Sequence, residues 1–196
     1  MGKLYVIMGK SATGKDTIFH NLLNRDDVSV KEVVTYTTRP IRSGETHGKE
    51  YFFVSQQEMY ELEEEGKIIE CREYDTVHGP WFYFTVDDGQ VDLAKGDYAM
   101  ISTLEGYEKI KKHFGQESVV PIYITVEDFT RLERALAREK QQRIPCVAEV
   151  CRRYLADEED FSAEKLASAE VLGSVVNDDV EHAMEQVISI IQTKNI

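Results

Sequence analysis

Residues 4–17 read LYVIMGKSATGKDT and hold the first indication of the architecture. The apolar run 4–8 predicts a buried strand, and the pattern that starts at Asp16 predicts a helix after a glycine-rich turn. The turn, residues 9–15, matches G-x-x-x-x-G-K. Its glycines let successive backbone N–H groups surround phosphate oxygens at the positive end of the helix dipole, and Lys15 adds a full charge. We expect a phosphate-binding loop; the alternative is an ordinary glycine-rich turn with a surface lysine.

The ligand expected at this loop is a nucleoside triphosphate accompanied by Mg²⁺. A serine or threonine hydroxyl for the metal normally follows the lysine, but this chain has Asp16 there and Thr17 next. A carboxylate beside the triphosphate is either repulsive or a metal ligand, so Asp16 and Thr17 are the predicted ligands of Mg²⁺. The predicted contacts to this triphosphate in this segment are Gly9, Ser11, Ala12, Thr13, Gly14, Lys15, Asp16 and Thr17.

Length and charge exclude several classes of protein. At roughly 150 residues per domain, a chain of 196 residues favours a single domain. With 36 acidic and 23 basic residues the net charge is −13, and this field repels nucleic-acid phosphates and anionic lipids. No apolar run approaches the roughly 18 residues of a membrane span. Three cysteines without a C-x-x-C pair are expected to be reduced thiols. We expect a cytoplasmic protein with no nucleic-acid or membrane partner.

Strand and helix patterns alternate along the chain. Because parallel strands need long crossover connections, this alternation predicts an α/β fold with a parallel sheet flanked by helices. The predicted strands are 4–8, 51–54, 98–102, 119–126 and, more weakly, 171–176, and the predicted helices are 16–23, 56–65, 104–113, 127–140, 148–158 and 179–192. Residues 35–85 break this rhythm with dense aromatics, turn glycines and short strands, which suggests an inserted lobe.

Residues 35–55 read TYTTRPIRSGETHGKEYFFVS and place Arg39, Arg42 and the hydroxyl of Tyr51 in one turn-rich segment. Since an arginine fork matches the spacing of phosphate oxygens, the two arginines are a candidate clamp for a phosphomonoester. Taken alone, they are equally compatible with solvated loop charges. The segment as a whole resembles the nucleotide-binding stretch of guanylate kinases, T-T-R-x-x-R-x-G-E-x-x-G-x-x-Y-x-F-V-S.

This resemblance to the guanylate kinase family implies that Arg39, Arg42 and Tyr51 hold the phosphate of GMP, with Thr35 as a further contact. Residues 67–70, KIIE, resemble the family's F-(I/L)-E, whose carboxylate accepts hydrogen bonds from the N1–H and exocyclic amine of guanine. Adenine cannot supply that donor pair and would leave a buried Glu70 unsatisfied. The resemblance therefore implies that Glu70 selects guanine; the alternative is an exposed strand carboxylate.

The family's next motif, Y-G-(T/S), contributes a tyrosine to the GMP phosphate and a hydroxyl to the base. Two registers compete in this chain. Residues 78–80, HGP, keep the glycine but lose both hydroxyls, whereas residues 83–85, YFT, keep both hydroxyls but need an insertion. We favour Tyr83 and Thr85 as GMP contacts over the register of His78 and Pro80. The alternative is that the aromatic residues here only pack the lobe.

The main departure from the family lies after the predicted strand 98–102. The family has D-x-D-x-Q-G there, with acidic residues that serve the metal and the guanine, whereas residues 101–106 read ISTLEG. Both aspartates are absent. Because the two positions lie at the ends of neighbouring strands in this architecture, we hypothesise that Asp16 supplies part of the missing negative charge at Mg²⁺.

Residues 127–140 place three arginines on one helix face, and a second helix after a polar turn carries two more. This arrangement resembles the family's lid, R-L-x-x-R and then E-x-x-x-R-(L/M), which folds over ATP. The resemblance assigns contact with the transferring phosphoryl group to Arg138 and Arg153, with Arg134 and Arg152 as weaker candidates. The alternative is a solvated charged face.

Residues 175–179, VVNDD, resemble the family's (I/V)-(I/V)-N-D-D, which implies that Asn177 lies near the adenine of ATP. By physical chemistry alone, Asn177 or Asp178 is the predicted N-cap of the helix that follows. Both roles are compatible.

The resemblance implies a P-loop NTPase-type enzyme in which ATP + GMP give ADP + GDP, with Mg²⁺ as cofactor and Lys15, Arg138 and Arg153 as catalytic residues. We expect one domain over 1–196, with a core of about 1–34 and 97–196, a helical lid at about 134–153 and a GMP-binding lobe at about 35–96. Two alternatives are a guanylate-kinase-like binding module with weak or no catalysis and a kinase of this fold with another acceptor. A monomer or a homodimer is expected.

Overall fold

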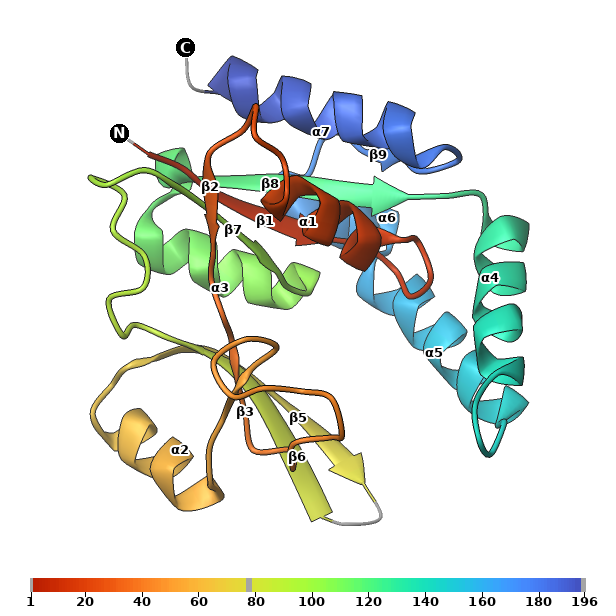
Figure 1. Cartoon of the computed structure of the whole chain (residues 1–196), viewed down its shortest axis with the longest axis horizontal. Coiled ribbons are helices and arrows are strands. Elements are labelled where there is room, and N and C mark those ends of the chain that lie inside the picture. The colour runs from red at the N-terminus through yellow and green to blue at the C-terminus, as the bar shows by residue number, and fades with distance from the viewer. Residues whose placement is uncertain (1, 77–78, 195–196) are drawn as a thin grey trace.

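The computed structural model describes residues 2–76 and 79–194. Its centre is a five-stranded sheet in the order β2-β7-β1-β8-β9, in which all neighbours are parallel (Figure 1). The strands are β1 (Leu4–Met8), β2 (Val30–Glu32), β7 (Asp97–Ile101), β8 (Val119–Thr125) and β9 (Val175–Val176). The predicted α/β architecture with a parallel central sheet is confirmed.

The central strand β1 is buried at all five positions because helices cover both of its faces. Tyr5 and Ile7 pack in one apolar cluster with α1 (Lys15–Leu23) and α7 (Val180–Lys194). The alternate residues of β1 pack in a second cluster with α3 (Leu104–Phe114) and with the partly buried Leu166 of α6 (Ala163–Ser168). A continuous apolar run is therefore the sequence that this strand requires.

The parallel arrangement brings several chain segments to one edge of the sheet. Ile7 of β1 pairs with Ile101 of β7 on one side and with Ile122 of β8 on the other. Because parallel strands end at the same edge, the glycine-rich turn after β1 and the segment after β7 emerge side by side. The predicted functional segments therefore meet at the carboxyl edge of the sheet.

A second, smaller sheet has the strand order β4-β3-β6-β5. It consists of β3 (Tyr36–Thr37), β4 (Phe52–Phe53), β5 (Ile68–Thr76) and β6 (Gly79–Val86), and α2 (Gln56–Glu64) belongs to the same region. Its own small core consists of Met59, Phe82, Phe84 and Val86. We call residues 36–86 the acceptor lobe.

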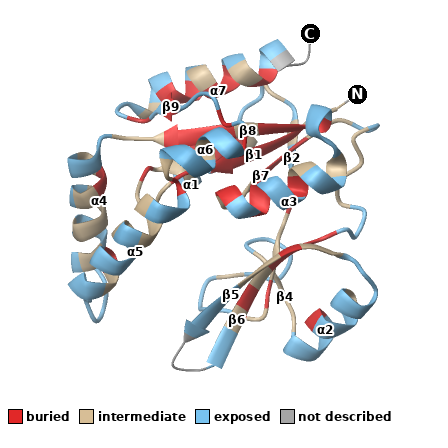
Figure 2. Cartoon of the chain, turned by 180° about the vertical axis from the view of Figure 1, so that it is seen from behind, coloured by how far each residue is buried: buried red, intermediate tan, exposed pale blue. Residues whose placement is uncertain are grey.

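Two helices, α4 (Asp128–Lys140) and α5 (Val147–Asp160), form an antiparallel pair at the side of the molecule (Figure 1). Most of their surface is exposed or half-buried (Figure 2). Arg131 of α4 and Val150 of α5 are buried. Arg131 is 2% exposed, forms ion pairs with Asp157 and Glu158 and lies 4.0 Å from the ring centre of Tyr154. This buried arginine ties the two helices together near their base.

Some predicted details are wrong. The hairpin of β5 and β6 was not predicted as two long strands, because β5 carries charged residues and is largely exposed toward its far end. The short β2, α6 and the one-turn helix η1 (Gln116–Ser118) were also missed. The N-cap of α7 is neither Asn177 nor Asp178: Asp179 accepts the backbone N–H of His182 at 2.9 Å. Within the described residues no helix is long and apolar enough to cross a membrane.

Candidate active site

The glycine-rich turn forms a compact loop between β1 and α1. Ala12 and Gly14 both have left-handed backbone angles, with φ of 64° and 86°. Thr13 is buried, and its hydroxyl donates to the carbonyl of Lys10 at 3.0 Å. A Cβ at Gly9 would lie 2.4 Å from the carbonyl oxygen of Ile124, so only glycine fits against β8 there. A strained non-glycine residue at Ala12 is typical of a functional loop.

Asn177 fastens this loop to the end of β9. The side-chain amide of Asn177 donates to the backbone carbonyl of Thr13 at 2.7 Å. The backbone carbonyl of Asn177 accepts hydrogen bonds from the guanidinium of Arg134 at 3.2 Å. A Cβ at Gly14 would lie 2.3 Å from the amide nitrogen of Asn177. The side-chain oxygen of Asn177 is buried without a hydrogen-bond partner among residues 2–76 and 79–194. Asn177 is thus a positioning residue for the loop, a role that motif matching alone did not indicate.

The first turn of α1 carries Lys15, Asp16 and Thr17. The ammonium of Lys15 lies 3.7 Å from the carboxylate of Asp16, and both Asp16 and Thr17 are exposed. Over the described ranges no group of three or more histidine, cysteine or acidic side chains is placed to hold a metal ion. Mg²⁺ beside a nucleotide needs only one or two protein oxygens, because phosphates and water complete its shell. One carboxylate and one hydroxyl therefore fit Mg²⁺ that arrives with a triphosphate.

A cavity of about 650 Å³ connects the start of α1 with the acceptor lobe. Its lining includes Asp16, Ile101, Thr35, Tyr51 and Tyr83. Asp16 and Ile101 thus face the same space, as the hypothesis about the missing aspartates requires. Burial raises the pKa of Tyr51, and the negative charge of Asp16 raises it further. This electrostatic effect is consistent with the proximity of the two side chains.

Arg39 is built into the lobe and only 3% exposed. Its guanidinium donates to both carboxylate oxygens of Glu45, at 3.0 and 2.8 Å, and to the hydroxyl of Tyr83 at 3.1 Å. The guanidinium also lies over the rings of Tyr51 and Phe53, 5.6 and 5.5 Å from their centres. The hydrogen bonds from Arg39 lower the pKa of Glu45 below its ordinary value. Arg39 is therefore an ordered cation whose fork is largely occupied by Glu45.

Arg42 differs from Arg39, because it is exposed. Its backbone N–H donates to Glu45 at 2.7 Å, so the same carboxylate organises both ends of this turn. Glu45 was part of the matched pattern but was not singled out as a site residue. Its place in the R-x-x-R-x-G-E spacing was the available indication.

Glu70 and Thr85 lie opposite each other on β5 and β6. They are 2% and 3% exposed, and the hydroxyl of Thr85 donates to Glu70 at 2.7 Å. The alternative assignment of the motif to residues 78–80 lies elsewhere on the hairpin. Pro80 pairs with Asp75 near its far end, and His78 lies outside the described residues. Glu70 is buried, so it is not a solvent-exposed strand carboxylate.

Arg72 covers the carboxylate of Glu70, which the sequence analysis did not anticipate. It donates from Nε and Nη2 to the two oxygens at 3.1 and 3.2 Å. No motif pointed to Arg72. The alternation of a strand was the available indication, since residues two apart share one face.

The segment after β7 carries no acidic residue at the two positions where the family has aspartates. Thr103 caps α3 and accepts the N–H of Gly106 at 3.1 Å, while the hydroxyl of Ser102 is buried with no partner in the part of the chain that is described. Glu105 is exposed and pairs with Lys109 along the helix at 2.7 Å. The missing negative charge is therefore not restored from this segment.

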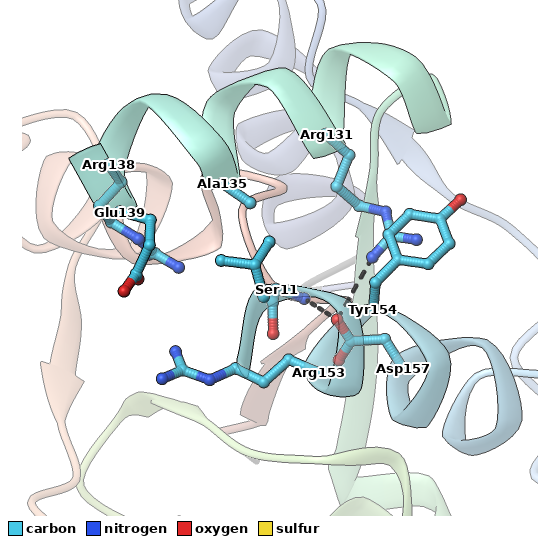
Figure 3. Close-up of a pocket in the computed structure, with 9 residues that line it drawn as sticks. Ser11, Arg131, Ala135, Arg138, Glu139, Arg153, Tyr154 and Asp157 are labelled. Atoms are coloured by element: carbon cyan, nitrogen blue, oxygen red, sulfur yellow. Dashed lines mark hydrogen bonds and ion pairs between the residues drawn. The ribbon is translucent and has the colours of Figure 1, made fainter. Parts of the chain in front are cut away.

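Arg138 and Arg153 come from α4 and α5 and line a small cavity beside Ser11 (Figure 3). Both are exposed. Arg153 donates to Glu149 at 2.9 Å. Arg152, which does not line this cavity, also binds Glu149, and the hydrogen bonds from these two arginines lower the pKa of Glu149 to about 2.

The helix pair also contacts the phosphate loop through two acidic residues of α5. The backbone N–H of Ser11 donates to Asp157 at 2.8 Å (Figure 3). Lys10 pairs with Glu158 at 2.7 Å. Neither acid was recognised from the sequence, because each acts across about 150 residues of chain. The helix pair and the glycine-rich loop are therefore joined by a hydrogen bond and an ion pair.

These features define a class of protein: an α/β protein with a glycine-rich loop between β1 and α1, a helix pair that contacts this loop, and a lobe that shares a cavity with the start of α1. The chain belongs to the guanylate kinase family, whose model, described as Guanylate kinase, matches residues 1–194. Guanylate kinases of Thiobacillus denitrificans and Thermotoga maritima are both 31% identical to it. The alignments cover 96% and 98% of this chain and 85% and 87% of those proteins.

A solved structure supports the fold. The crystal structure of guanylate kinase from Anaplasma phagocytophilum matches with a TM-score of 0.61 and 24% sequence identity. The match covers 98% of this chain and 86% of that one. The likeness extends over the core, the lobe and the helix pair together.

Proposed function

We propose that this protein transfers the γ-phosphoryl group of ATP to GMP, giving ADP and GDP. The observation that carries the proposal is the cavity shared by the start of α1 and the phosphate-binding side of the acceptor lobe. A phosphate oxygen of GMP attacks the γ-phosphorus, and the bond from that phosphorus to the β-phosphate oxygen breaks. No general base is needed, because the attacking phosphate is already ionised. The protein's task is to position both nucleotides and to neutralise charge.

The donor side is the phosphate loop. The backbone N–H groups of residues 9–14 and the ammonium of Lys15 hold the β- and γ-phosphates. Asn177 keeps the loop in shape through Thr13 and lies on the side assigned to adenine. The oxygens of Asp16 and Thr17 hold Mg²⁺, which neutralises phosphate charge when bound.

The acceptor side is the lobe. Arg39, Arg42, Tyr51 and Tyr83 hold the phosphate of GMP, and Thr35 adds a hydroxyl from the core side of the cavity. Glu70 and Thr85 are the buried polar pair that we assign to the base. Their mutual hydrogen bond keeps a polar pair ordered where the base is recognised.

The lid completes the site. Arg138 and Arg153 move onto the transferring phosphoryl group and exclude water when both nucleotides are bound. Glu149 holds Arg153 until then, while Asp157 and Glu158 hold the buried Arg131. Free thiols at Cys71, Cys146 and Cys151 suit the cytoplasm, where we place the enzyme.

A coupled assay of ADP release tests the proposal. The protein is supplied with ATP and Mg²⁺ and with GMP, dGMP, AMP, CMP or UMP in turn, and ATP alone measures background hydrolysis. We expect turnover with GMP and dGMP and little with the others. No turnover above background with GMP contradicts the proposal.

Because the two aspartates are absent, one alternative function is also tested: a module that binds a phosphorylated or acidic partner without catalysis. Such a module has no use for the phosphate loop, so ATP binding by calorimetry separates it from an enzyme. Asp16→Asn probes the metal directly: we expect turnover to require more Mg²⁺. An unchanged Mg²⁺ titration removes Asp16 from the metal site.

A further inference from the structure

The buried end of the acceptor pocket contains an arginine that none of the matched motifs assigns. Arg72 lies two residues after Glu70 on β5, and both side chains project from the same face of the strand. Its fork engages both oxygens of Glu70, while Thr85 donates to one of them at 2.7 Å. The three side chains form a connected group at the seam between the lobe and α3.

The carboxylate of Glu70 has little capacity left for a ligand. A carboxylate offers about four acceptor positions, two on each oxygen. Thr85 and Arg72 together take both positions on Oε1, and Arg72 takes one on Oε2. Guanine would need one acceptor on each oxygen for its N1–H and its exocyclic amine. It cannot dock both donors on Glu70 while Arg72 keeps its place.

Burial leads to the same conclusion. The side chain of Glu70 is 0% exposed, whereas that of Arg72 is 19% exposed. Arg72 lines the cavity of about 650 Å³ that contains Tyr51 and Tyr83. It also lines a second cavity, of about 550 Å³, beside Thr103 and Leu104 of the core. Glu70 lines neither cavity. A base that enters from either side meets Arg72 first.

The chemistry of Arg72 differs from that of a carboxylate. Glu70 engages two of the five guanidinium N–H groups, and in the described part of the chain none of the others is bonded to protein. A guanidinium only donates, so it pairs with a base edge that presents acceptors. In a 6-oxopurine, O6 and N7 form such an edge and match an arginine fork. In adenine the 6-amino group would oppose those donors.

We propose that Arg72 is a specificity-determining residue, which reads the O6 and N7 edge of a 6-oxopurine monophosphate while Glu70 and Thr85 hold it in position. The inference rests on the proposed function and deepens it. Under this arrangement the exocyclic amine of guanine makes no required contact. Inosine monophosphate, which is guanylate without that amine, is then accepted about as well as GMP.

The test compares kcat/KM for GMP and for inosine monophosphate in the full-length protein and in Arg72→Ala. In the wild type we expect a ratio below about 5, since no polar group depends on the amine. In Arg72→Ala we expect the ratio to rise about tenfold or more, because the uncovered Glu70 accepts a charge-assisted hydrogen bond from the amine. The rate with inosine monophosphate falls most.

Arg72→Lys is a second variant for the case in which Arg72→Ala does not fold. Lysine keeps a positive charge beside Glu70 but lacks the two-pronged donor geometry of arginine. We expect its ratio to shift in the same direction. Arg25→Ala is the matched control: Arg25 also pairs through a fork with a carboxylate two residues away, Asp27, but it is exposed and lies outside both cavities. Both rates should stay within about twofold of the wild type in that variant.

Two results overturn the inference: a wild-type preference for GMP above about 100-fold, or a ratio that is the same in the wild type, Arg72→Ala and Arg72→Lys. Absence of ADP with either nucleotide contradicts the proposed function instead. In that case the dissociation constants of GMP and inosine monophosphate are measured by calorimetry. Their ratio tests the role of Arg72 with the same thresholds. Failure of both nucleotides to bind contradicts the function and the inference together.

Discussion

The start of α1, directly after the glycine-rich loop, lines the same cavity as the acceptor lobe, but the loop and the lobe hold their positive groups in different ways. The loop relies on backbone N–H groups and on Lys15, and its shape is maintained by packing and by the hydrogen bond from Asn177. In the lobe, Arg39 and Arg72 are already paired with Glu45 and Glu70. In the loop, carboxylates reach the Ser11 N–H and Lys10, but most of the donors are backbone dipoles that need no counter-ion. A ligand of Arg39 or Arg72 must share or replace a carboxylate.

The largest expected effect is at Lys15, the lysine at the end of the loop. Lys15→Met should lower kcat by about 10²–10³, because preorganised charge at the transferring group typically contributes that much. The coupled assay of ADP release measures it. Lys109→Met is a control, since Lys109 is an exposed helical lysine paired with Glu105. A loss of less than about tenfold in Lys15→Met would show that the backbone alone carries the charge.

The second prediction tests whether packing maintains the loop. Gly14→Ala should lower the free energy of unfolding by about 2–3 kcal/mol, through left-handed strain and the displaced hydrogen bond of Asn177. Gly66→Ala is the matched control, because Gly66 also has positive φ but a Cβ there meets nothing within 4 Å. Urea unfolding should show about 1 kcal/mol for that variant. Equal losses in both variants would mean that the contact between Gly14 and Asn177 is unimportant.

The third prediction concerns the pairing in the lobe. Glu45→Gln should reduce stability by about 1–2 kcal/mol, because the buried guanidinium of Arg39 loses its charged acceptor. Saturating GMP should recover more stability in this variant than in the wild type, since its phosphate takes the place of the carboxylate. Urea unfolding with and without GMP measures both effects. Equal recovery would indicate that the phosphate binds elsewhere and that the lobe does not exchange one anion for another.

The smallest effect is expected at the exposed lid. Because hydrogen bonds from Arg152 and Arg153 lower the pKa of Glu149 from 4.5 to about 2, its contribution to stability is complete above pH 4.5 and is lost as the pH falls toward 2. Solvent screening keeps that contribution below about 1 kcal/mol. The difference in unfolding free energy between the wild type and Glu149→Gln should therefore disappear across this range. A difference that persists at pH 2 would contradict the assignment.

Much of the architecture was predictable, because its information is local. The apolar run of β1, the loop after it and the helix patterns follow from neighbours in the chain, and the parallel sheet follows from their alternation. The hairpin of β5 and β6 was missed because its charged, half-exposed strands have no clear apolar period. Asp179, rather than Asn177 or Asp178, caps the last helix, and the side chain of Asn177 is used by the loop.

The sequence by itself determined the types of group at both ends of the reaction: a glycine-rich loop with Lys15 and a segment with Arg39, Arg42 and Tyr51. Only the tertiary structure decided which of these groups are already occupied. Asp157 reaches Ser11 across 146 positions, and Thr85 meets Glu70 across 15. The reason is physical: a motif specifies which donors and acceptors are present, but hydrogen bonds form between whatever groups folding brings within about 3 Å.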